Sequence, residues 1–182
     1  MRISFATPRA SNEIGGYNGY GYATLCILKS LEELGYEVND NDPTADVEFA
    51  FNQPQNWRFK GKDSYKIGYH PWESTELLPG WADIMNECDE IWTPSPLIAD
   101  WYTRYAGVRV PVYVYEHGVE HDWSPVKREP EHTIKFLHVG DETRKAQGDT
   151  WTCFNDAFNG YRDDVTLTLK GRGTWNKFDK IG

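Results

Sequence analysis

Short runs of hydrophobic and β-branched residues alternate with longer amphipathic stretches along this 182-residue chain. The short runs predict buried strands over residues 3–6, 47–51, 66–69, 90–93 and 112–115. The amphipathic stretches predict helices over residues 20–35, 80–88 and 96–106. Such alternation is typical of βαβ units, in which helices cover both faces of a parallel sheet. We therefore expect an α/β fold.

The first predicted helix, residues 20–35, has a clear periodicity. One helical face carries Thr24, Ile27, Leu28, Leu31 and Leu34. We expect this face to pack on the sheet. Gly35 is a natural stop for the helix, because glycine readily adopts the left-handed conformation that ends many helices.

A polar, proline-bearing stretch at residues 123–133 is the best candidate for a linker. It predicts one domain over residues 1–125 and the start of another over residues 126–182. In the second domain a strand at 134–139, a helix at 149–158 and a strand at 165–169 form one βαβ unit. One such unit has too few strands to close a doubly wound sheet by itself.

Composition and charge limit the partners and the cellular location that we expect for this protein. The formal charge of −9 argues against nucleic acid and anionic membranes as partners. Three widely spaced cysteines, with no Cys-x-x-Cys pair, fit reduced thiols. With neither a signal peptide nor an 18-residue apolar run, we expect a cytoplasmic protein with no membrane insertion. The aromatic content of 15% fits either a sugar site or an ordinary core.

A glycine-rich segment containing Gly15, Gly16 and Gly19 lies between the first strand and the first helix. Backbone N–H groups and the helix dipole at such a junction can receive a phosphate. A flexible turn without a ligand is the alternative. Because Thr24 stands where the dinucleotide motif needs its third Gly or Ala, an oxidoreductase is only a weak third option.

His70 and Glu73 follow the predicted strand at residues 66–69. Loops at the carboxyl ends of strands are where open α/β sheets bind ligands, so these two residues are candidate site residues. The alternatives are a helix-capping box at Glu73 or Ser74 and a structural role for His70.

His117, Glu120 and His121 match an inverted zincin motif. That motif needs one continuous helix, whereas here a strand precedes the motif and Gly118 interrupts it. We therefore expect a loop and no metal site.

Arg144 and Lys145 lie between a strand and a helix in the second domain. Two cations at the positive end of a helix dipole indicate a bound anion, and diphosphate is the natural guest. Lys170, just after the next strand, would lie at the same sheet edge. A solvated charge pair is the alternative.

Taken together, these motifs resemble the retaining glycosyltransferases of family 4, which have the GT-B fold of two Rossmann-like domains. The resemblance runs through nearly the whole chain, from Trp72-Glu73-Ser74-Thr75 through Cys88-Asp89-Glu90-Ile91-Trp92-Thr93-Pro94-Ser95 and Glu116-His117-Gly118-Val119 to Phe136-Leu137-His138-Val139-Gly140, Arg144-Lys145 and Leu169-Lys170-Gly171.

The resemblance implies an acceptor-side domain followed by the opening of a donor-side domain. It implies transfer of a sugar from a nucleotide diphosphate sugar to an unknown acceptor, with retention, without a metal and without a further cofactor. Fixed cations then stabilise the leaving diphosphate. Arg144 and Lys145 would hold it, aided by N–H groups of the Gly15–Gly21 loop, while His70 and Glu73 would contact and orient the sugar or acceptor.

The family's Glu-x7-Glu element, which grips the donor, does not appear before Gly182. The resemblance therefore implies a chain that stops within the donor domain. The alternative function is a catalytically inactive, shortened GT-B-like module that binds a partner or has a structural role. Exposed strand edges in such a module could pair with a second copy of the chain, so this alternative is compatible with a homo-oligomer.

Overall fold

The computed structural model describes residues 1–7, 19–118, 124–125, 127, 132–140, 145–158, 164–171 and 174–178. The chain divides into two compact units, Met1–Glu120 and His121–Gly182. Most of the predicted linker at residues 123–133 lies outside the described residues.

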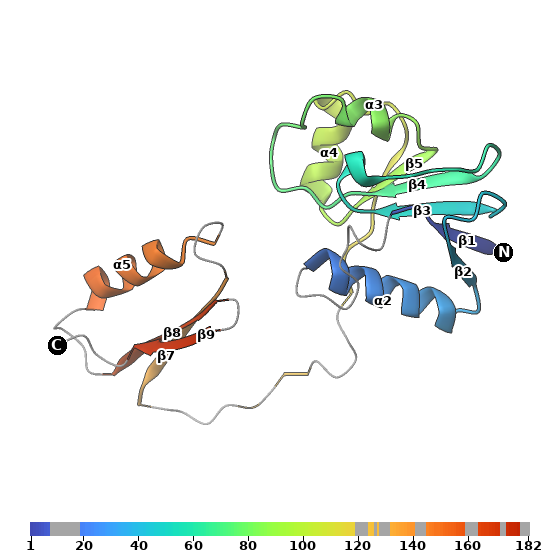
Figure 1. Ribbon diagram of the computed structural model, residues 1–182. Helices are drawn as coiled ribbons and strands as arrows, with labels where there is room; N and C mark the ends of the chain where they lie inside the picture. Colours follow the sequence, from blue (N-terminus) through green and yellow to red (C-terminus); the bar gives the residue numbers. More distant parts are fainter. Residues whose placement is uncertain are drawn as a thin grey trace. The chain divides into compact units, whose positions relative to one another are not determined.

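A six-stranded parallel sheet forms the centre of the first unit (Figure 1). Its strands are β1 (Arg2–Phe5), β2 (Glu37–Asp40), β3 (Val47–Phe51), β4 (Tyr65–Tyr69), β5 (Glu90–Thr93) and β6 (Val112–Val114). The strand order is β2-β1-β3-β4-β5-β6, and every pairing is parallel. The α/β prediction is confirmed, and the sheet is Rossmann-like. Strand β2 was not predicted, because this polar edge strand contains only one apolar residue, Val38.

Helices lie on both faces of this sheet. Helix α2 (Gly19–Glu33) covers one face, and α3 (Trp81–Met85), α4 (Pro96–Arg104) and the short 3-10 helix η1 (Pro54–Asn56) lie on the other (Figure 1). The core on the α2 face contains Ile3, Phe5, Leu28, Phe49, Phe51, Ile67 and Tyr69. The core on the opposite face contains Ala6, Ala50, Trp57, Met85, Cys88, Ile91, Ile98, Tyr102 and Val108.

The predicted buried face of α2 is correct except at its last position. Thr24 and Leu28 are buried, and Ile27 and Leu31 pack against the core. Leu34 is 72% exposed, because the helix ends one residue before it. Gly35 ends the helix as predicted, with φ +82° and a bond from its N–H to the carbonyl of Glu32.

Gly68 in β4 is required by a close approach. The Trp57 ring lies against its backbone, and a Cβ at this position would overlap that ring. Trp57 is held there by a 3.0 Å hydrogen bond from its Nε1 to the carbonyl of Asn52. Glycine therefore makes room for the indole that caps this face of the sheet.

The second unit contains the predicted βαβ unit. Strand β7 (Ile134–Val139), helix α5 (Gln147–Phe158) and strand β8 (Val165–Gly171) follow in that order, with β7 and β8 parallel. Phe136 on β7 packs against Phe154 and Phe158 of α5, with ring centroids 5.7 and 5.5 Å away. A further strand, β9 (Thr174–Phe178), pairs antiparallel with β8 and was not predicted.

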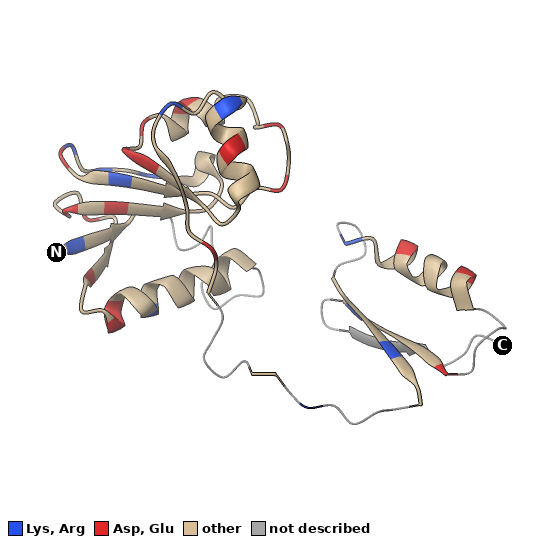
Figure 2. Ribbon diagram, turned by 180° about the vertical axis from the view of Figure 1, so that it is seen from behind, with Lys and Arg blue, Asp and Glu red and all other residues tan. Residues whose placement is uncertain are grey.

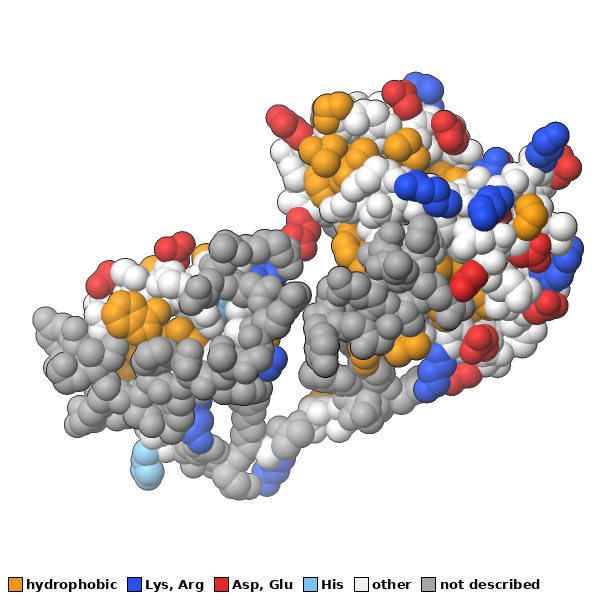
Figure 3. Space-filling model, viewed as in Figure 1, with side chains coloured by type: hydrophobic (Ala, Val, Ile, Leu, Met, Phe, Trp, Pro, Cys, Tyr) orange, Lys and Arg blue, Asp and Glu red, His pale blue; other side chains and the backbone are white. Residues whose placement is uncertain are grey.

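Charged residues are scattered over the first unit. Acidic and basic positions are interspersed on its described elements, and no continuous basic stripe crosses them in the view of Figure 2. Such stripes are typical of nucleic-acid-binding domains. Hydrophobic side chains reach the surface of both units (Figure 3).

Candidate functional site

A row of buried polar residues crosses the carboxyl edge of the first sheet. Asn52, His70 and Thr93 are 4%, 0% and 0% exposed. Asn52 directly follows β3, His70 directly follows β4, and Thr93 is the last residue of β5. The three are neighbours in the sheet register, since Phe51 pairs with Tyr69 and Tyr69 pairs with Trp92. Side chains alternate along a strand, so all three lie on the face that η1, α3 and α4 cover.

His70 is enclosed by aromatic rings. Its ring stacks with Trp72 and Tyr102 at centroid distances of 5.3 and 6.0 Å, and meets Trp81 edge-on at 5.2 Å. The Tyr102 hydroxyl lies 2.6 Å from His70 Nδ1. The imidazole is therefore held by α4, α3 and the segment that follows β4.

Burial decides the charge state of this pair. Desolvation lowers the pKa of His70 to about 3, and it raises the pKa of Tyr102 above its usual range. Both groups are neutral at physiological pH. His70 is thus suited to hydrogen bonding and not to carrying charge or accepting a proton.

Glu73 is exposed, although it lies only three residues after His70. The chain between β4 and α3 is irregular, and within it Trp72 Nε1 donates to the carbonyl of Glu76 at 3.0 Å. No helix begins at Glu73 or Ser74, so the capping-box alternative is wrong there. The predicted site residues His70 and Glu73 thus differ sharply in burial.

An aromatic cluster lies on the opposite, α2 face of the same edge. The His117 ring stacks on Tyr69 at 5.5 Å, and the Tyr69 hydroxyl donates to the carbonyl of Tyr115 at 2.6 Å. The ring centroids of Trp92 and Tyr115 are 4.2 Å apart. Burial lowers the pKa of His117. His117 follows β6 in a non-helical segment, as predicted, whereas Glu120 and His121 lie outside the described residues.

Two predicted cations of the second unit lie at its carboxyl edge. The Gly140 N–H donates to the carbonyl of Lys170 at 2.9 Å. A Cβ at Gly140 would overlap the stem of Lys145 and lie 3.5 Å from His138 Nε2. Both lysines therefore belong to segments next to the carboxyl end of β7. Lys145 lies two residues before α5 begins, and Lys170 is near the end of β8.

The remaining predicted anion-binding residues are Gly15, Gly16, Gly19 and Arg144. Gly15, Gly16 and Arg144 lie outside the described residues. Gly19 is the first residue of α2 and is exposed, and nothing lies within 4 Å of a Cβ placed on it. Packing in the described residues therefore does not require glycine at position 19.

The sequence analysis missed Glu48, a fully buried carboxylate on β3. Its Oε1 accepts the N–H of Lys60 at 2.7 Å, and its Oε2 accepts the N–H of Gly61 at 3.0 Å and the hydroxyl of Ser64 at 2.7 Å. Three donors satisfy the two oxygens, so this carboxylate fixes the chain before β4. An acidic residue inside an apolar strand run was the available signal.

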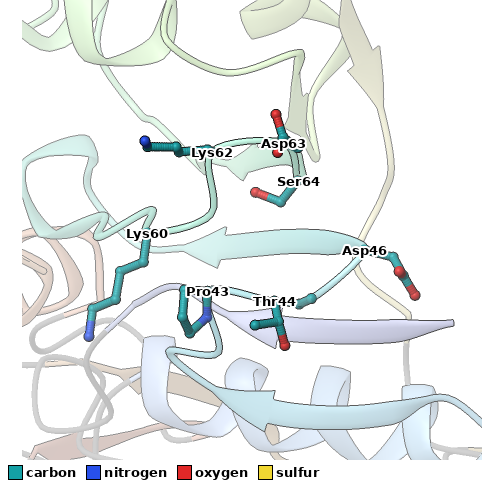
Figure 4. A pocket seen from close by; sticks show the side chains of 8 residues that line it. Pro43, Thr44, Asp46, Lys60, Lys62, Asp63 and Ser64 are labelled. Atoms are coloured by element: carbon teal, nitrogen blue, oxygen red, sulfur yellow. The ribbon is translucent and has the colours of Figure 1, made fainter.

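A pocket of about 470 Å³ lies at the amino edge of the first sheet. It is formed by residues 43–46 before β3 and by Lys60, Lys62, Asp63 and Ser64 before β4. The charged side chains point in different directions and do not converge on one position (Figure 4). Parallel sheets bind ligands at the other edge, so this pocket is not the candidate site.

The described residues contain neither a metal-binding cluster nor a membrane-spanning helix. No group of three or more His, Cys, Asp and Glu side chains in these parts could hold a metal ion. None of the helices in the described ranges is long and apolar enough to span a bilayer. In comparisons with known proteins, no family model matches the chain, and neither a curated protein nor a solved structure matches it.

Proposed function

We propose that this chain is the acceptor-side domain and the opening of the donor-side domain of a retaining, metal-independent GT-B glycosyltransferase of family 4. It would move a sugar from a nucleotide diphosphate sugar to an acceptor. The proposed family rests on the sequence motifs, and the Rossmann-like sheet of the first unit supports the proposed GT-B fold.

The observation that carries the proposal is the reversal of strand order between β1 and β3. From β1 the chain passes to β2 on one side, and then to β3, β4, β5 and β6 on the other. Ligands of open parallel sheets bind outside the carboxyl ends of the strands at such a switch point. The connection that contains Gly15 and Gly16 leaves the carboxyl end of β1 and enters α2, where backbone N–H groups favour anions.

The second unit supports a diphosphate site of its own. The stem of Lys145 lies against Gly140 at the carboxyl end of β7, and the 12-residue helix α5 begins two residues after Lys145. Lys170 on β8 lies next to Gly140 through a backbone hydrogen bond. A helix N-terminus and lysine ammonium groups both stabilise the negative charge that develops on a leaving diphosphate. Arg144 precedes Lys145 in the chain and would add to this charge.

In this proposal, His70 is a neutral hydrogen-bonding group for the sugar or acceptor, and Glu73 orients the bound molecule. The low pKa of His70 fits that role, because a neutral imidazole has one N–H donor and one nitrogen acceptor at physiological pH. The leaving diphosphate would take the acceptor's proton, so no protein base is required.

Isothermal titration of the full chain with UDP-glucose, GDP-mannose, UDP and GDP tests the proposal. We expect saturable binding of one nucleotide series and about tenfold weaker binding in Lys145→Ala, because one charge-assisted contact is lost. Lys135→Ala removes the same charge at the other end of β7 and serves as the control. The absence of binding by every ligand at millimolar concentration would refute the donor assignment.

One observation favours the inactive module as a second candidate. Leu137 and Val139 on β7 are 63% and 58% exposed, and β7 is an edge strand of the described β7-β8-β9 sheet. Exposed apolar edges are covered in stable proteins by a partner or by further chain. A stable oligomer in native mass spectrometry, together with no sugar-nucleotide binding, would favour the module.

A further inference from the structure

Two buried polar atoms in the first unit have no hydrogen-bond partner. In the described part of the chain, such atoms are His70 Nε2, Thr93 Oγ1 and, in the second unit, His138 Nε2. His70 and Thr93 are neighbours, because each follows a member of the Tyr69–Trp92 pair on adjacent strands. Adjacent strands are about 4.8 Å apart, and both side chains lie on the same face. The two residues that carry these unpaired atoms are thus lateral neighbours on one face of the sheet.

Tyr102 bonds one nitrogen of His70. Its hydroxyl lies 2.6 Å from His70 Nδ1, and burial raises its pKa, so it is protonated at physiological pH. Either group can donate in this bond, and the direction of the bond fixes the tautomer of the imidazole. When the Tyr102 hydroxyl donates to Nδ1, the hydrogen of the neutral imidazole lies on Nε2. In that tautomer His70 presents an N–H donor at Nε2.

We infer that His70 Nε2–H and Thr93 Oγ1 together form a receptor for one neutral hydroxyl group. The His70 N–H donates to the guest oxygen, and the threonine hydroxyl accepts the guest hydrogen. Such a guest is a water molecule or one hydroxyl of a polyol ligand. Buried water commonly pairs polar groups that would otherwise be unsatisfied.

The described side chains around His70 and Thr93 are apolar or neutral. The rings of Trp57, Trp72 and Trp81 face His70, and Ile91 lies one pleat before Thr93 on the same face. Tyr102, which is bonded to His70, is neutral. Among these side chains an ion would lose its hydration without meeting a counter-charge, so they favour a neutral guest.

Trp72 decides whether water or a polyol ligand can reach the pair. Its ring covers His70, and its Nε1 is bonded within its own segment, to the carbonyl of Glu76. Because the Trp72 ring lies over His70, a polyol hydroxyl would reach the pair only if the segment between β4 and α3 moved aside, whereas a water molecule requires no such movement. The polyol source rests on the proposed function, whereas the water source does not.

The first arm of the test uses 15N NMR of the full chain. We expect wild-type His70 to show the neutral Nε2–H tautomer and an Overhauser effect from that hydrogen to a long-lived water. Tyr102→Phe should mix the two tautomers, which loss of packing alone would not do. A wild-type Nδ1–H tautomer, or no water contact, would overturn the inference for water.

Thr93→Val provides an independent measurement through urea denaturation. If Thr93 Oγ1 binds a guest, the variant's midpoint falls, because the guest loses its acceptor. If the hydroxyl has no guest, the midpoint rises, because an unsatisfied polar group is replaced by a methyl group of the same shape. A rise would therefore overturn the receptor.

The second arm adds UDP-glucose or GDP-mannose and follows the His70 Nε2–H resonance in wild type and in Trp72→Ala. We expect the resonance to shift on saturation, with a tighter response in Trp72→Ala. Sugar-nucleotide binding that depends on Lys145 but leaves this resonance unmoved would overturn the polyol source alone. No binding at all would refute the proposed function and leave the water arm to decide the receptor.

Discussion

Replacing the buried carboxylate of Glu48 tests how the first unit holds the chain before β4. In Glu48→Gln the side chain keeps its shape but has one acceptor oxygen instead of two. Wherever that oxygen lies, the new amide NH₂ faces a backbone N–H, either that of Lys60 or that of Gly61. The Ser64 hydroxyl can rotate to accept, so it adapts.

The expected magnitude follows from these contacts. One unsatisfied buried N–H costs about 1–3 kcal/mol, so Glu48→Gln should lower the free energy of unfolding by that amount. Glu48→Ala loses all three contacts and leaves a cavity, and a loss of about 3–5 kcal/mol is expected. Glu33 on α2 has a side chain that is 66% exposed, so Glu33→Gln should change stability by less than about 0.5 kcal/mol.

Native-state hydrogen exchange by NMR is the appropriate assay, because whole-chain fluorescence mixes the transitions of two units. The amides of Lys60 and Gly61 should exchange faster in Glu48→Gln than in wild type, while amides of the second unit stay unchanged. Exchange at those two amides equal to that of Glu33→Gln would refute the claim that the carboxylate holds them.

Three further predictions concern buried residues of the first unit, whose urea denaturation is followed by its own NMR signals, as for Thr93→Val. Gly68→Ala should destabilise by about 1–3 kcal/mol in urea denaturation, because the new methyl group overlaps the Trp57 ring; an unchanged midpoint would contradict this close approach. The pKa of His70 is about 3 in the folded state, below its ordinary 6.5, so the unfolded chain binds the proton first and stability falls as pH drops below about 6.5. By pH 5 the loss from His70 is about 2 kcal/mol, and His70→Asn should remove this part of the dependence and leave the part from His117, whose pKa burial also lowers; equal slopes in both proteins would show that His70 is not buried neutral. A thiol reagent should modify exposed Cys153 in the native protein and Cys88, whose pKa burial raises to about 12, only in urea; rapid native labelling of Cys88, detected by mass spectrometry, would contradict its burial.

Elements with a strong apolar pattern were predicted well. Strands β3, β5 and β7 have the predicted limits, since each is a continuous or alternating apolar run bounded by polar residues. Strands β2 and β9 were missed. Each carries polar residues at many positions and gains its hydrogen bonds from a neighbour that is distant or reversed in direction. Local pattern does not encode that neighbour.

The sequence predicted where His70 lies in the sheet but not its burial or its hydrogen bonding. A position after a strand correctly placed His70 at the carboxyl edge. Its burial, its bond to Tyr102 and its neighbour Thr93 come from three elements separated in the chain, so no local motif reports them. Glu48 was missed for the same reason, because its three donors lie 12 to 16 residues further along.

The sequence by itself determined the α/β class, the helix end at Gly35 and the polar residues at strand ends, because periodicity and turn chemistry act over a few residues. Only the tertiary structure decided the strand order, and with it the switch point between β1 and β3. It also decided that His70 is neutral and enclosed while Glu73 lies in solvent. Charge state and pairing depend on which distant groups exclude water from a side chain, and chain folding alone sets that.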